Sequence, residues 1–101
     1  MILFKRALLR LVLEGEKTTT MRTHTRWTVG RIYAVSDGYR PGAALVQVTG
    51  RRTVRLGDLT DADARKEGFA TLSELRAWWA ENMGAWNPEQ TVTVYEIALT
   101  P

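Results

Sequence analysis

The pattern of hydrophobic and polar positions changes along the chain, from a dense apolar block near the start to alternation further on. The block between about Lys5 and Glu14 contains Leu8, Leu9, Leu11, Val12 and Leu13. This density predicts a mostly buried helix, and Gly15 just past its end predicts a stop with positive φ. Alternation at residues 44–49 and 91–99 instead predicts strands that turn one face toward a core.

Shorter segments complete the set of strands. The threonine-rich segment after Gly15 favours a strand over a helix, and Gly30 opens another apolar segment. Gly50 predicts a turn or a bulge within the strand region. The predicted strands lie at residues 2–4, 18–22, 31–35, 44–49, 53–56 and 91–99.

Two helices are predicted between the last two strands. Thr60 is a suitable N-cap, acidic residues follow it, and Gly68 ends the segment. Thr71 and Glu74 have the spacing of a capping box. The helix that follows them carries one apolar stripe of Leu72, Leu75 and Trp79. This order of elements predicts an α+β fold, a small and mostly antiparallel β-barrel or curved sheet with flanking helices.

Length and composition narrow the class of protein. The 101 residues predict a single domain over 1–101, and the absence of cysteine excludes disulfides, thiolate zinc sites and a cysteine nucleophile. The apolar runs are shorter than the roughly 20 residues of a membrane span. The basic pair Lys5 and Arg6 follows apolar residues, the reverse of a signal peptide, so we expect a cytoplasmic protein without a membrane partner.

Charge is distributed unevenly. Residues 1–57 carry 11 Lys or Arg and 3 acids, whereas residues 58–101 carry 3 Lys or Arg and 8 acids. If the basic part forms one face, that face could attract a nucleotide or a nucleic acid. The alternative is that the two parts form ion pairs with each other in the folded domain.

Candidate chemistry concentrates in the segment Gly15-Glu16-Lys17-Thr18-Thr19-Thr20-Met21-Arg22. On a strand Thr20 and Arg22 share a face, and turn geometry could bring the Lys17 amine to that face. A threonine hydroxyl needs a neighbouring base, and burial beside Arg22 would lower the pKa of a lysine toward that role. The alternative is a solvated turn lysine and an ordinary strand hydroxyl. His24, the single histidine, cannot build a His-rich metal centre, and its polar loop predicts a solvated side chain.

The pattern G-x-K-x-x-T-x-R after an apolar helix, with Gly30 opening the next strand, resembles the ASCH domain of the PUA-like superfamily. The similarity continues through Leu56-Gly57-Asp58-Leu59-Thr60, Lys66-Glu67-Gly68-Phe69 and Leu72-x-x-Leu75. The resemblance is strongest to small bacterial ASCH proteins, some of which are amidohydrolases acting on N(4)-acetylcytidine and similar N-acylated cytosines. It implies that Lys17, Thr20 and Glu67 are catalytic and that Arg22 holds the pocket or meets a phosphate. It implies neither a metal nor an organic cofactor.

The same resemblance supports a rival class, an RNA-binding module or a nuclease without amidohydrolase activity. Arginines that could contact phosphates are Arg26, Arg31, Arg40, Arg51, Arg52 and Arg55. Trp27 and Tyr39 could stack on bases, whereas Tyr33 and Trp79 are expected to be structural. Trp78, adjacent to Trp79, should point away from the core. The expected partner is therefore an acylated cytosine nucleoside or RNA, bound by a monomer or a weak homodimer.

Overall fold

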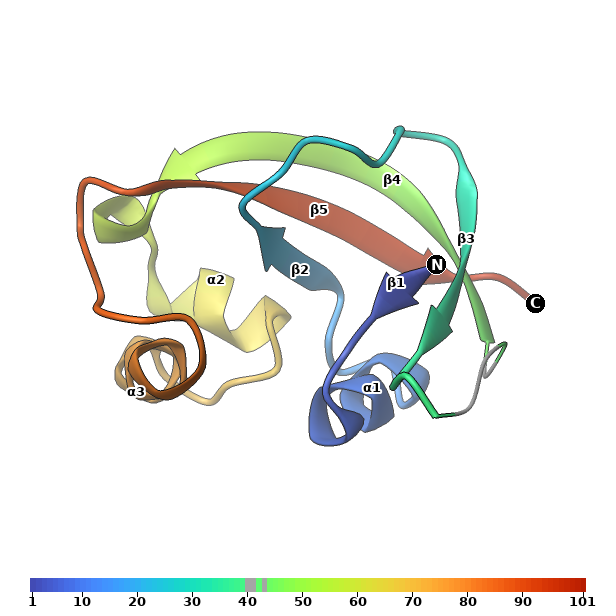
Figure 1. The fold of residues 1–101 in the computed structure, drawn as a ribbon, viewed down its shortest axis with the longest axis horizontal. Helices are drawn as coiled ribbons and strands as arrows, with labels where there is room; N and C mark the ends of the chain where they lie inside the picture. The colour runs from blue at the N-terminus through green and yellow to red at the C-terminus, as the bar shows by residue number, and fades with distance from the viewer. Residues whose placement is uncertain (40–41, 43) are drawn as a thin grey trace.

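The computed structural model describes residues 1–39, 42 and 44–101. These described residues form five strands, three α-helices and one short 3-10 turn (Figure 1). In order these are β1 (Ile2–Leu3), α1 (Arg6–Leu13), β2 (Thr19–Arg22), β3 (Ile32–Ser36), β4 (Ala44–Arg55), the 3-10 turn (Leu56–Asp58), α2 (Asp61–Lys66), α3 (Leu72–Asn82) and β5 (Thr91–Leu99). The predicted α+β class is confirmed.

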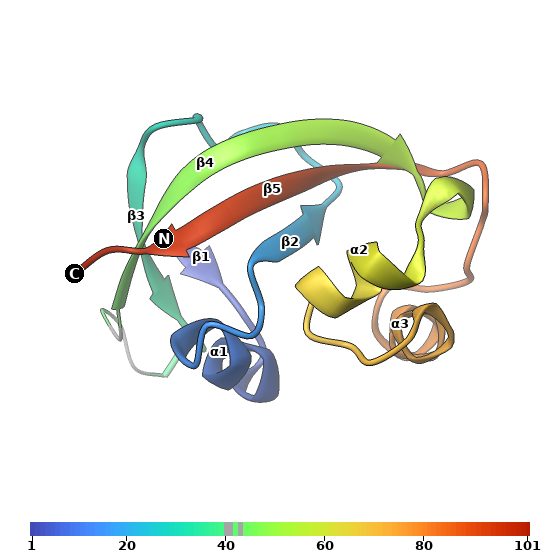
Figure 2. The same cartoon turned by 180° about the vertical axis from the view of Figure 1, so that it is seen from behind.

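The strands form one curled sheet, a half-barrel, in the order β1-β3-β4-β5-β2. Only the pair of β1 with β3 is parallel, and the other pairs among the described residues are antiparallel. The two long strands, β4 and β5, arch over the molecule, and all three helices lie beneath the arch (Figures 1 and 2). The expected mostly antiparallel, barrel-like sheet is therefore confirmed.

The long strand β4 combines two segments that the sequence separates. Its register against β5 shifts between Val48 and Gly50, which marks a bulge, and pairing continues to Arg55. Gly50 therefore bends the strand without ending it, since a bulge increases local twist while the ladder resumes beyond it. This bend lets one strand serve both halves of the arch.

The helix boundaries follow the capping signals, with one difference. Thr60 and Asp63 form a full capping box at the start of α2. Thr71 accepts a hydrogen bond from the Glu74 amide at the start of α3, but the Glu74 carboxylate accepts from the amide of Ala70 instead of Thr71. Among the described residues, no helix has both the length and the apolar character needed to cross a membrane.

Two hydrophobic clusters support the two halves of the arch. The first lies between α1 and the strands β3, β4 and β5 and consists of Ile2, Phe4, Leu9, Val12, Trp27, Val35, Val46, Val48, Tyr95 and Ile97. The second lies against α2 and α3 and consists of Met21, Leu56, Leu59, Ala64, Leu75, Trp79, Val92 and Val94. Buried polar residues, notably Lys17, Thr19, Thr20 and Glu67, also occur inside the protein. A buried polar group needs partners, so these residues mark the place to look for a site.

Candidate active site

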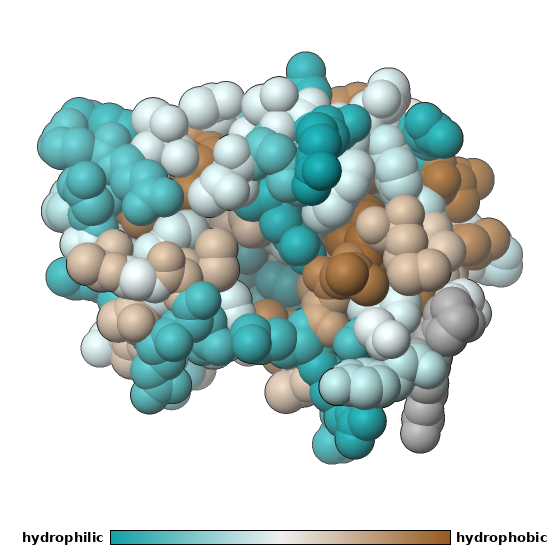
Figure 3. Space-filling view, in the orientation of Figure 1, coloured by the Kyte–Doolittle hydropathy of each residue, from teal (hydrophilic) through white to brown (hydrophobic). Residues whose placement is uncertain are grey.

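A pocket of about 170 Å³ opens where the two hydrophobic clusters meet. Its lining residues come from β1, α1, β2, α3 and the connections beside them: Leu3, Phe4, Lys5, Leu8, Lys17, Thr20, Met21, Arg22, Glu67, Phe69, Leu75, Trp78, Trp79 and Met83. The space-filling view has a hollow near the middle of this face, with hydrophilic atoms in its depth (Figure 3). The pocket is thus apolar on most of its wall and charged at its floor.

Lys17 reaches this pocket because of how α1 ends. Gly15 takes a positive φ of 78°, and the amides of Glu16 and Lys17 both donate to the carbonyl of Leu11. The next amide, that of Thr18, donates to the carbonyl of Lys66 at 2.8 Å, which ties the segment to the end of α2. The predicted stop at Gly15 is confirmed, and its effect is to turn the lysine inward.

Gly68 allows the end of α2 to approach the end of α1 closely. Its φ is 98°, and a Cβ there would lie 2.7 Å from Cδ1 of Leu11 and 3.6 Å from Cβ of Lys17. A side chain would therefore meet α1 and would also be strained by the backbone conformation. The glycine places Glu67, its neighbour in the chain, against Lys17.

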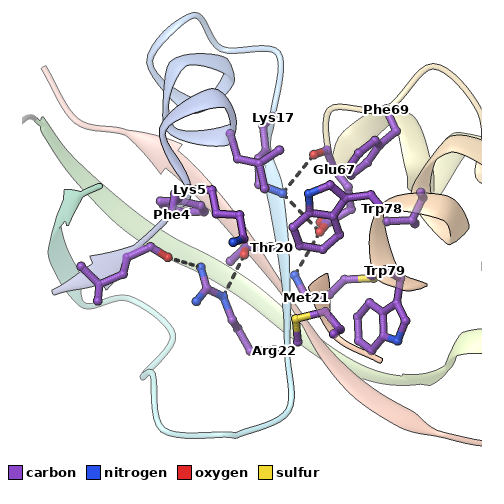
Figure 4. Close-up of a pocket in the computed structure, with 14 residues that line it drawn as sticks. Phe4, Lys5, Lys17, Thr20, Met21, Arg22, Glu67, Phe69, Trp78 and Trp79 are labelled. Carbon is purple, nitrogen blue, oxygen red and sulfur yellow. Dashed lines mark hydrogen bonds and ion pairs between the residues drawn. The ribbon is translucent and has the colours of Figure 1, made fainter. Parts of the chain in front are cut away.

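The Glu67 carboxylate is the centre of the polar cluster. It accepts hydrogen bonds from Nζ of Lys17 at 3.2 Å and from the backbone amide of Met21 at 3.1 Å (Figure 4). It also accepts one from the hydroxyl of Thr19. The Lys17 amine also donates to the Glu67 carbonyl at 3.0 Å. Both side chains are almost fully buried, at 2% and 6% exposure. Several donors thus hold the carboxylate in one orientation.

Thr19 is a member of this cluster that the sequence analysis left out. Successive residues of a strand point to opposite faces, and Thr20 lines the pocket whereas Thr19 does not. The carboxylate of Glu67 nevertheless reaches the face of Thr19, because it comes from α2 and lies beside β2. The contact could be predicted only from the position of the end of α2 beside β2, which no local pattern in the sequence indicates.

Burial lowers the pKa of the Lys17 amine below its ordinary value. The loss of solvation is the largest cause, the Glu67 carboxylate opposes it, and the nearby positive charge of Arg22 adds to the lowering. A lower pKa favours the neutral amine, which is the form that can accept a proton. The environment of Lys17 therefore lowers its pKa, in the direction that the sequence analysis expected for a buried lysine beside Arg22.

Thr20 and Arg22 lie side by side on the pocket face of β2. The Arg22 Nε donates to the Thr20 hydroxyl oxygen at 3.1 Å, and its Nη2 donates to the Leu3 carbonyl at 2.7 Å. The guanidinium also lies 5.2 Å from the centre of the Phe4 ring and 4.9 Å from that of Trp27. Arg22 is thus fixed, and it fixes the Thr20 oxygen while leaving the hydroxyl proton free to point elsewhere.

The structure brings Lys17, Thr20 and Glu67 to one pocket, but it does not join the amine to the hydroxyl. Nζ of Lys17 donates to Glu67, while the Thr20 oxygen accepts from Arg22, and no hydrogen bond among the described residues links Lys17 to Thr20. The amine and the hydroxyl therefore line the same pocket, each held by a different partner.

The other residues expected to bind substrate or nucleic acid lie in different places. Arg26 is exposed beside the pocket mouth and borders a neighbouring groove that Arg22 also lines. Trp27 also lines that groove, but it is buried in the first hydrophobic cluster with the Arg22 guanidinium against its ring, so it offers no open face on which a base could stack. Tyr39 is 83% exposed in the connection from β3 to β4 and does not line the pocket.

His24 is less solvated than its polar loop predicts. Its ring is half-buried, lies 4.6 Å from the Trp27 ring in a T-shaped contact, and accepts a hydrogen bond from the Arg26 amide at Nδ1. Desolvation by burial lowers its pKa, and the charges of Arg26 and Arg22 add to that effect. The histidine thus packs against aromatic rings where the sequence predicted contact with water.

Most of the candidate phosphate-binding arginines already have partners. Arg52 pairs with Asp63 at 2.8 Å, Arg55 with Asp58 at 3.1 Å, and Arg51 donates to the Thr25 carbonyl at 3.1 Å. Arg31 lies over the ring of Tyr33. Arg40 lies outside the described residues. The pairing between the basic and acidic parts of the chain, which the sequence left open, therefore occurs along β4.

Trp78 and Lys5 line the pocket as well. Trp79 is buried at 2% exposure in the second hydrophobic cluster, and the adjacent Trp78 forms part of the pocket wall beside Phe69 (Figure 4). The expectation that Trp78 points away from the core is wrong, because its ring packs against the second hydrophobic cluster as well as lining the pocket. Lys5 was not among the predicted site residues, because in the sequence it stands only as half of a basic pair with Arg6. Among residues 1–39, 42 and 44–101, no cluster of three or more His, Cys, Asp or Glu could hold a metal ion.

The family model that describes the ASCH domain matches residues 1–98 of this sequence. The chain belongs to the ASCH domain family. Since the match spans nearly the whole chain, the suggested family membership is confirmed. No curated protein matches the sequence.

Solved structures agree on the fold of this ASCH domain. An ASCH domain from Lactobacillus crispatus JV V101 superposes with a TM-score of 0.73 at 16% identity, covering 92% of this chain and 70% of that one. Protein EF3133 from Enterococcus faecalis V583 gives a TM-score of 0.72 at 18% identity, covering 93% of this chain and 67% of that one. At these identities the likeness concerns the fold.

Proposed function

We propose that this ASCH domain is an amidohydrolase that removes the acyl group from N(4)-acetylcytidine-type nucleosides. The observation that carries the proposal is the buried Lys17–Glu67 pair at the floor of a pocket that also exposes Thr20 and Arg22. Burying two charges costs free energy, and apolar residues of similar size often serve stability as well or better. A buried pair that opens into a pocket is therefore better explained by chemistry than by folding.

The pocket walls suit an acylated base. Phe4, Phe69 and Trp78 supply aromatic surface, while the polar atoms gather on one side. Aromatic side chains stack on nucleobases with little regard to sequence, and the few polar groups then fix the orientation. In this arrangement the acyl carbon of the substrate sits between Thr20 and Lys17, where the structure has no direct hydrogen bond.

The proposed reaction breaks the amide C–N bond and releases cytidine and acetate. The Thr20 hydroxyl, or a water that it holds, attacks the acyl carbon, and the neutral Lys17 amine takes the proton. Lys17 then passes a proton along its 3.2 Å contact to Glu67, which protonates the departing N4 nitrogen. Thr19 and the Met21 amide keep the carboxylate in place during these transfers. One water is consumed for each amide cleaved, including hydrolysis of any threonyl ester.

The rival reading, an RNA-binding module, has less support from the contacts. Phosphate binding along β4 would have to compete with the ion pairs of Arg52 and Arg55. Trp27, which could have stacked on a base, is buried in the core. These contacts favour the hydrolase over a binding surface that follows the strand.

The deciding experiment is to incubate purified protein with N(4)-acetylcytidine and follow the ultraviolet absorbance as it becomes cytidine. The matched control is Thr20→Val, which keeps the shape of the side chain and removes the hydroxyl. A parallel titration with single-stranded RNA at several salt concentrations tests the rival, because each phosphate contact adds about −0.7 to the slope of log affinity against log salt. Absence of deacylation together with a steep salt slope would refute the proposal.

A further inference from the structure

The pocket continues sideways into a second, wider groove of about 470 Å³. The two hollows share Leu3, Arg22 and Met83, and the groove adds Met1, Thr23, His24, Arg26 and Trp27. A ligand whose base fills the pocket would therefore extend past Arg22 into the groove. The proposed reaction on a base does not use this space.

Charge in and beside the groove has one sign. The described residues that line it include Arg22 and Arg26 but no aspartate or glutamate. Lys5 stands at the mouth of the adjoining pocket, where the one acid, Glu67, is already paired with Lys17. Neither Lys5 nor Arg26 forms an ion pair with any described residue, in contrast to Arg52 and Arg55.

Arg22 lines both hollows and is held in a fixed position between them. Its Nε and Nη2 are engaged by Thr20 and Leu3, and two aromatic rings hold the guanidinium. The N–H groups of Nη1 have no partner among the described residues. A fixed guanidinium with free N–H groups fits the oxygens of a phosphate, because little side-chain entropy remains to be lost.

We propose that this groove binds a phosphate group of the substrate, so that the domain acts on nucleoside phosphates in preference to free nucleosides, with Arg26 as the residue that sets this preference. The inference rests on the proposed function for the identity of the base. The phosphate could belong to a free nucleotide or to an RNA strand, since the shared chemistry is a phosphate ester beside a cytosine. Arg22 also holds Thr20, so Arg26 is the cleaner position to change.

The test measures binding first, independently of turnover. Calorimetric titration compares cytidine with cytidine 5′-monophosphate and cytidine 3′-monophosphate on the intact protein. At least one monophosphate should bind about tenfold more tightly than cytidine, the effect of one charge-assisted hydrogen bond. Arg26→Gln should remove most of that difference, whereas Arg65→Gln should retain it. Arg65 is an exposed arginine of α2 outside both hollows, so its replacement removes the same charge.

A second measurement compares kcat/KM for N(4)-acetylcytidine and its monophosphates in the same three proteins. The ratio should favour a monophosphate in the wild type and in Arg65→Gln and fall toward one in Arg26→Gln. A short acetylcytidine-containing oligoribonucleotide identifies the source of the phosphate, since it should exceed the mononucleotide only if a strand is the natural ligand. Either result of that comparison supports a phosphate subsite.

The failures of the two proposals are distinguishable. Equal binding of cytidine and both monophosphates, or no detectable binding of any of them, overturns the phosphate subsite even if N(4)-acetylcytidine is hydrolysed. An unchanged preference in Arg26→Gln also overturns the role of that arginine. Absence of deacylation with a clear monophosphate preference would instead refute the amidohydrolase and leave the subsite standing.

Discussion

The domain contains a buried ion pair and an exposed ion pair that differ more in burial than in distance. Lys17 and Glu67 lie within 3.2 Å of each other with almost no exposed surface, at the junction of α1, α2 and β2. Arg52 and Asp63 come closer, at 2.8 Å, yet their side chains are 49% and 20% exposed on the outside of the domain. Distance alone would rank the second pair as the stronger.

The cost of removing one partner follows the opposite order, because it depends on burial. A surface pair exchanges water for a partner in a high dielectric and contributes about 0–1 kcal/mol to stability. A buried pair gives up its solvation entirely, so removing one partner leaves the other uncompensated and costs about 3–5 kcal/mol. The interior pair is therefore the place where small chemical changes should have large effects, and the pair on β4 is where they should not.

The largest effect is expected for Lys17→Met, which keeps most of the side-chain length and removes the charge. Glu67 would remain buried without its cation, so the free energy of unfolding should fall by about 3–5 kcal/mol. Turnover of N(4)-acetylcytidine should also be lost, because no base remains. Denaturant unfolding and the absorbance assay measure the two effects.

The double variant Lys17→Met with Glu67→Gln sharpens this result. The amide oxygen of Gln can still accept from Thr19 or from the Met21 amide, and no charge is left buried. The double variant should therefore lose less stability than the two single variants added together, since contacting residues are coupled. Strict additivity would mean that the pair contributes nothing as a pair.

The next largest effect separates the two threonines of β2 that flank the pair. Thr20→Val should reduce turnover about 10²-fold or more. The free energy of unfolding should fall by about 1.5–3 kcal/mol, because Nε of Arg22 loses its hydrogen-bond acceptor. Thr19→Val removes a donor from the Glu67 carboxylate and should cost about 1–3 kcal/mol of stability with a smaller loss of turnover. Equal loss of turnover in both variants would contradict a special role for Thr20.

A pH profile tests whether burial acts on Lys17 as the environment indicates. Since burial lowers the pKa of Lys17 below 10.5, kcat/KM should rise about tenfold per pH unit and level off before that value. Between the folded pKa and about 10.4 the unfolded state binds the additional proton, so this lysine should also make stability rise with pH. Lys17→Arg should lack both features. A profile that still rises at pH 10.5 would show a lysine of ordinary pKa.

The sequence could predict features that depend on neighbouring residues, but not contacts between distant segments such as the two ion pairs. Local signals were sufficient for the strand of β5, the stop at Gly15 and the N-cap at Thr60, since each depends on a few neighbouring residues. The alternation that put Thr20 and Arg22 on one face was likewise local. The likeness to the ASCH family supplied Glu67, which lies 50 positions from Lys17 and could not be paired with it by spacing.

The parts that the sequence missed depend on contacts between distant segments. Trp27 has polar neighbours in the chain, but the rings of Tyr33 and Tyr95 cover it after folding. Lys5 lies in the connection between β1 and α1, and it becomes part of the pocket because Arg22 of β2 lies over the ring of the preceding residue, Phe4. Whether the arginines of β4 face solvent or acids was likewise decided by α2 and by the approach to β5.

The smallest effect is expected at the surface pair, for Arg52→Gln. The free energy of unfolding should fall by no more than about 1 kcal/mol at neutral pH, and the difference should shrink in high salt.

The same pair should respond to acid through Asp63. Partial burial alone would raise the pKa of Asp63, but the hydrogen bonds from Thr60 and the charge of Arg52 together lower it below its ordinary value. A lowered folded pKa stabilises the protein above the unfolded value of about 3.9 and loses that contribution as pH falls through the folded pKa. The difference between Arg52→Gln and wild type should therefore vanish in urea titrations below that pH. If it persisted in acid, the arginine would stabilise β4 through its alkyl chain, and the contrast between the buried and the exposed pair would lose its electrostatic basis.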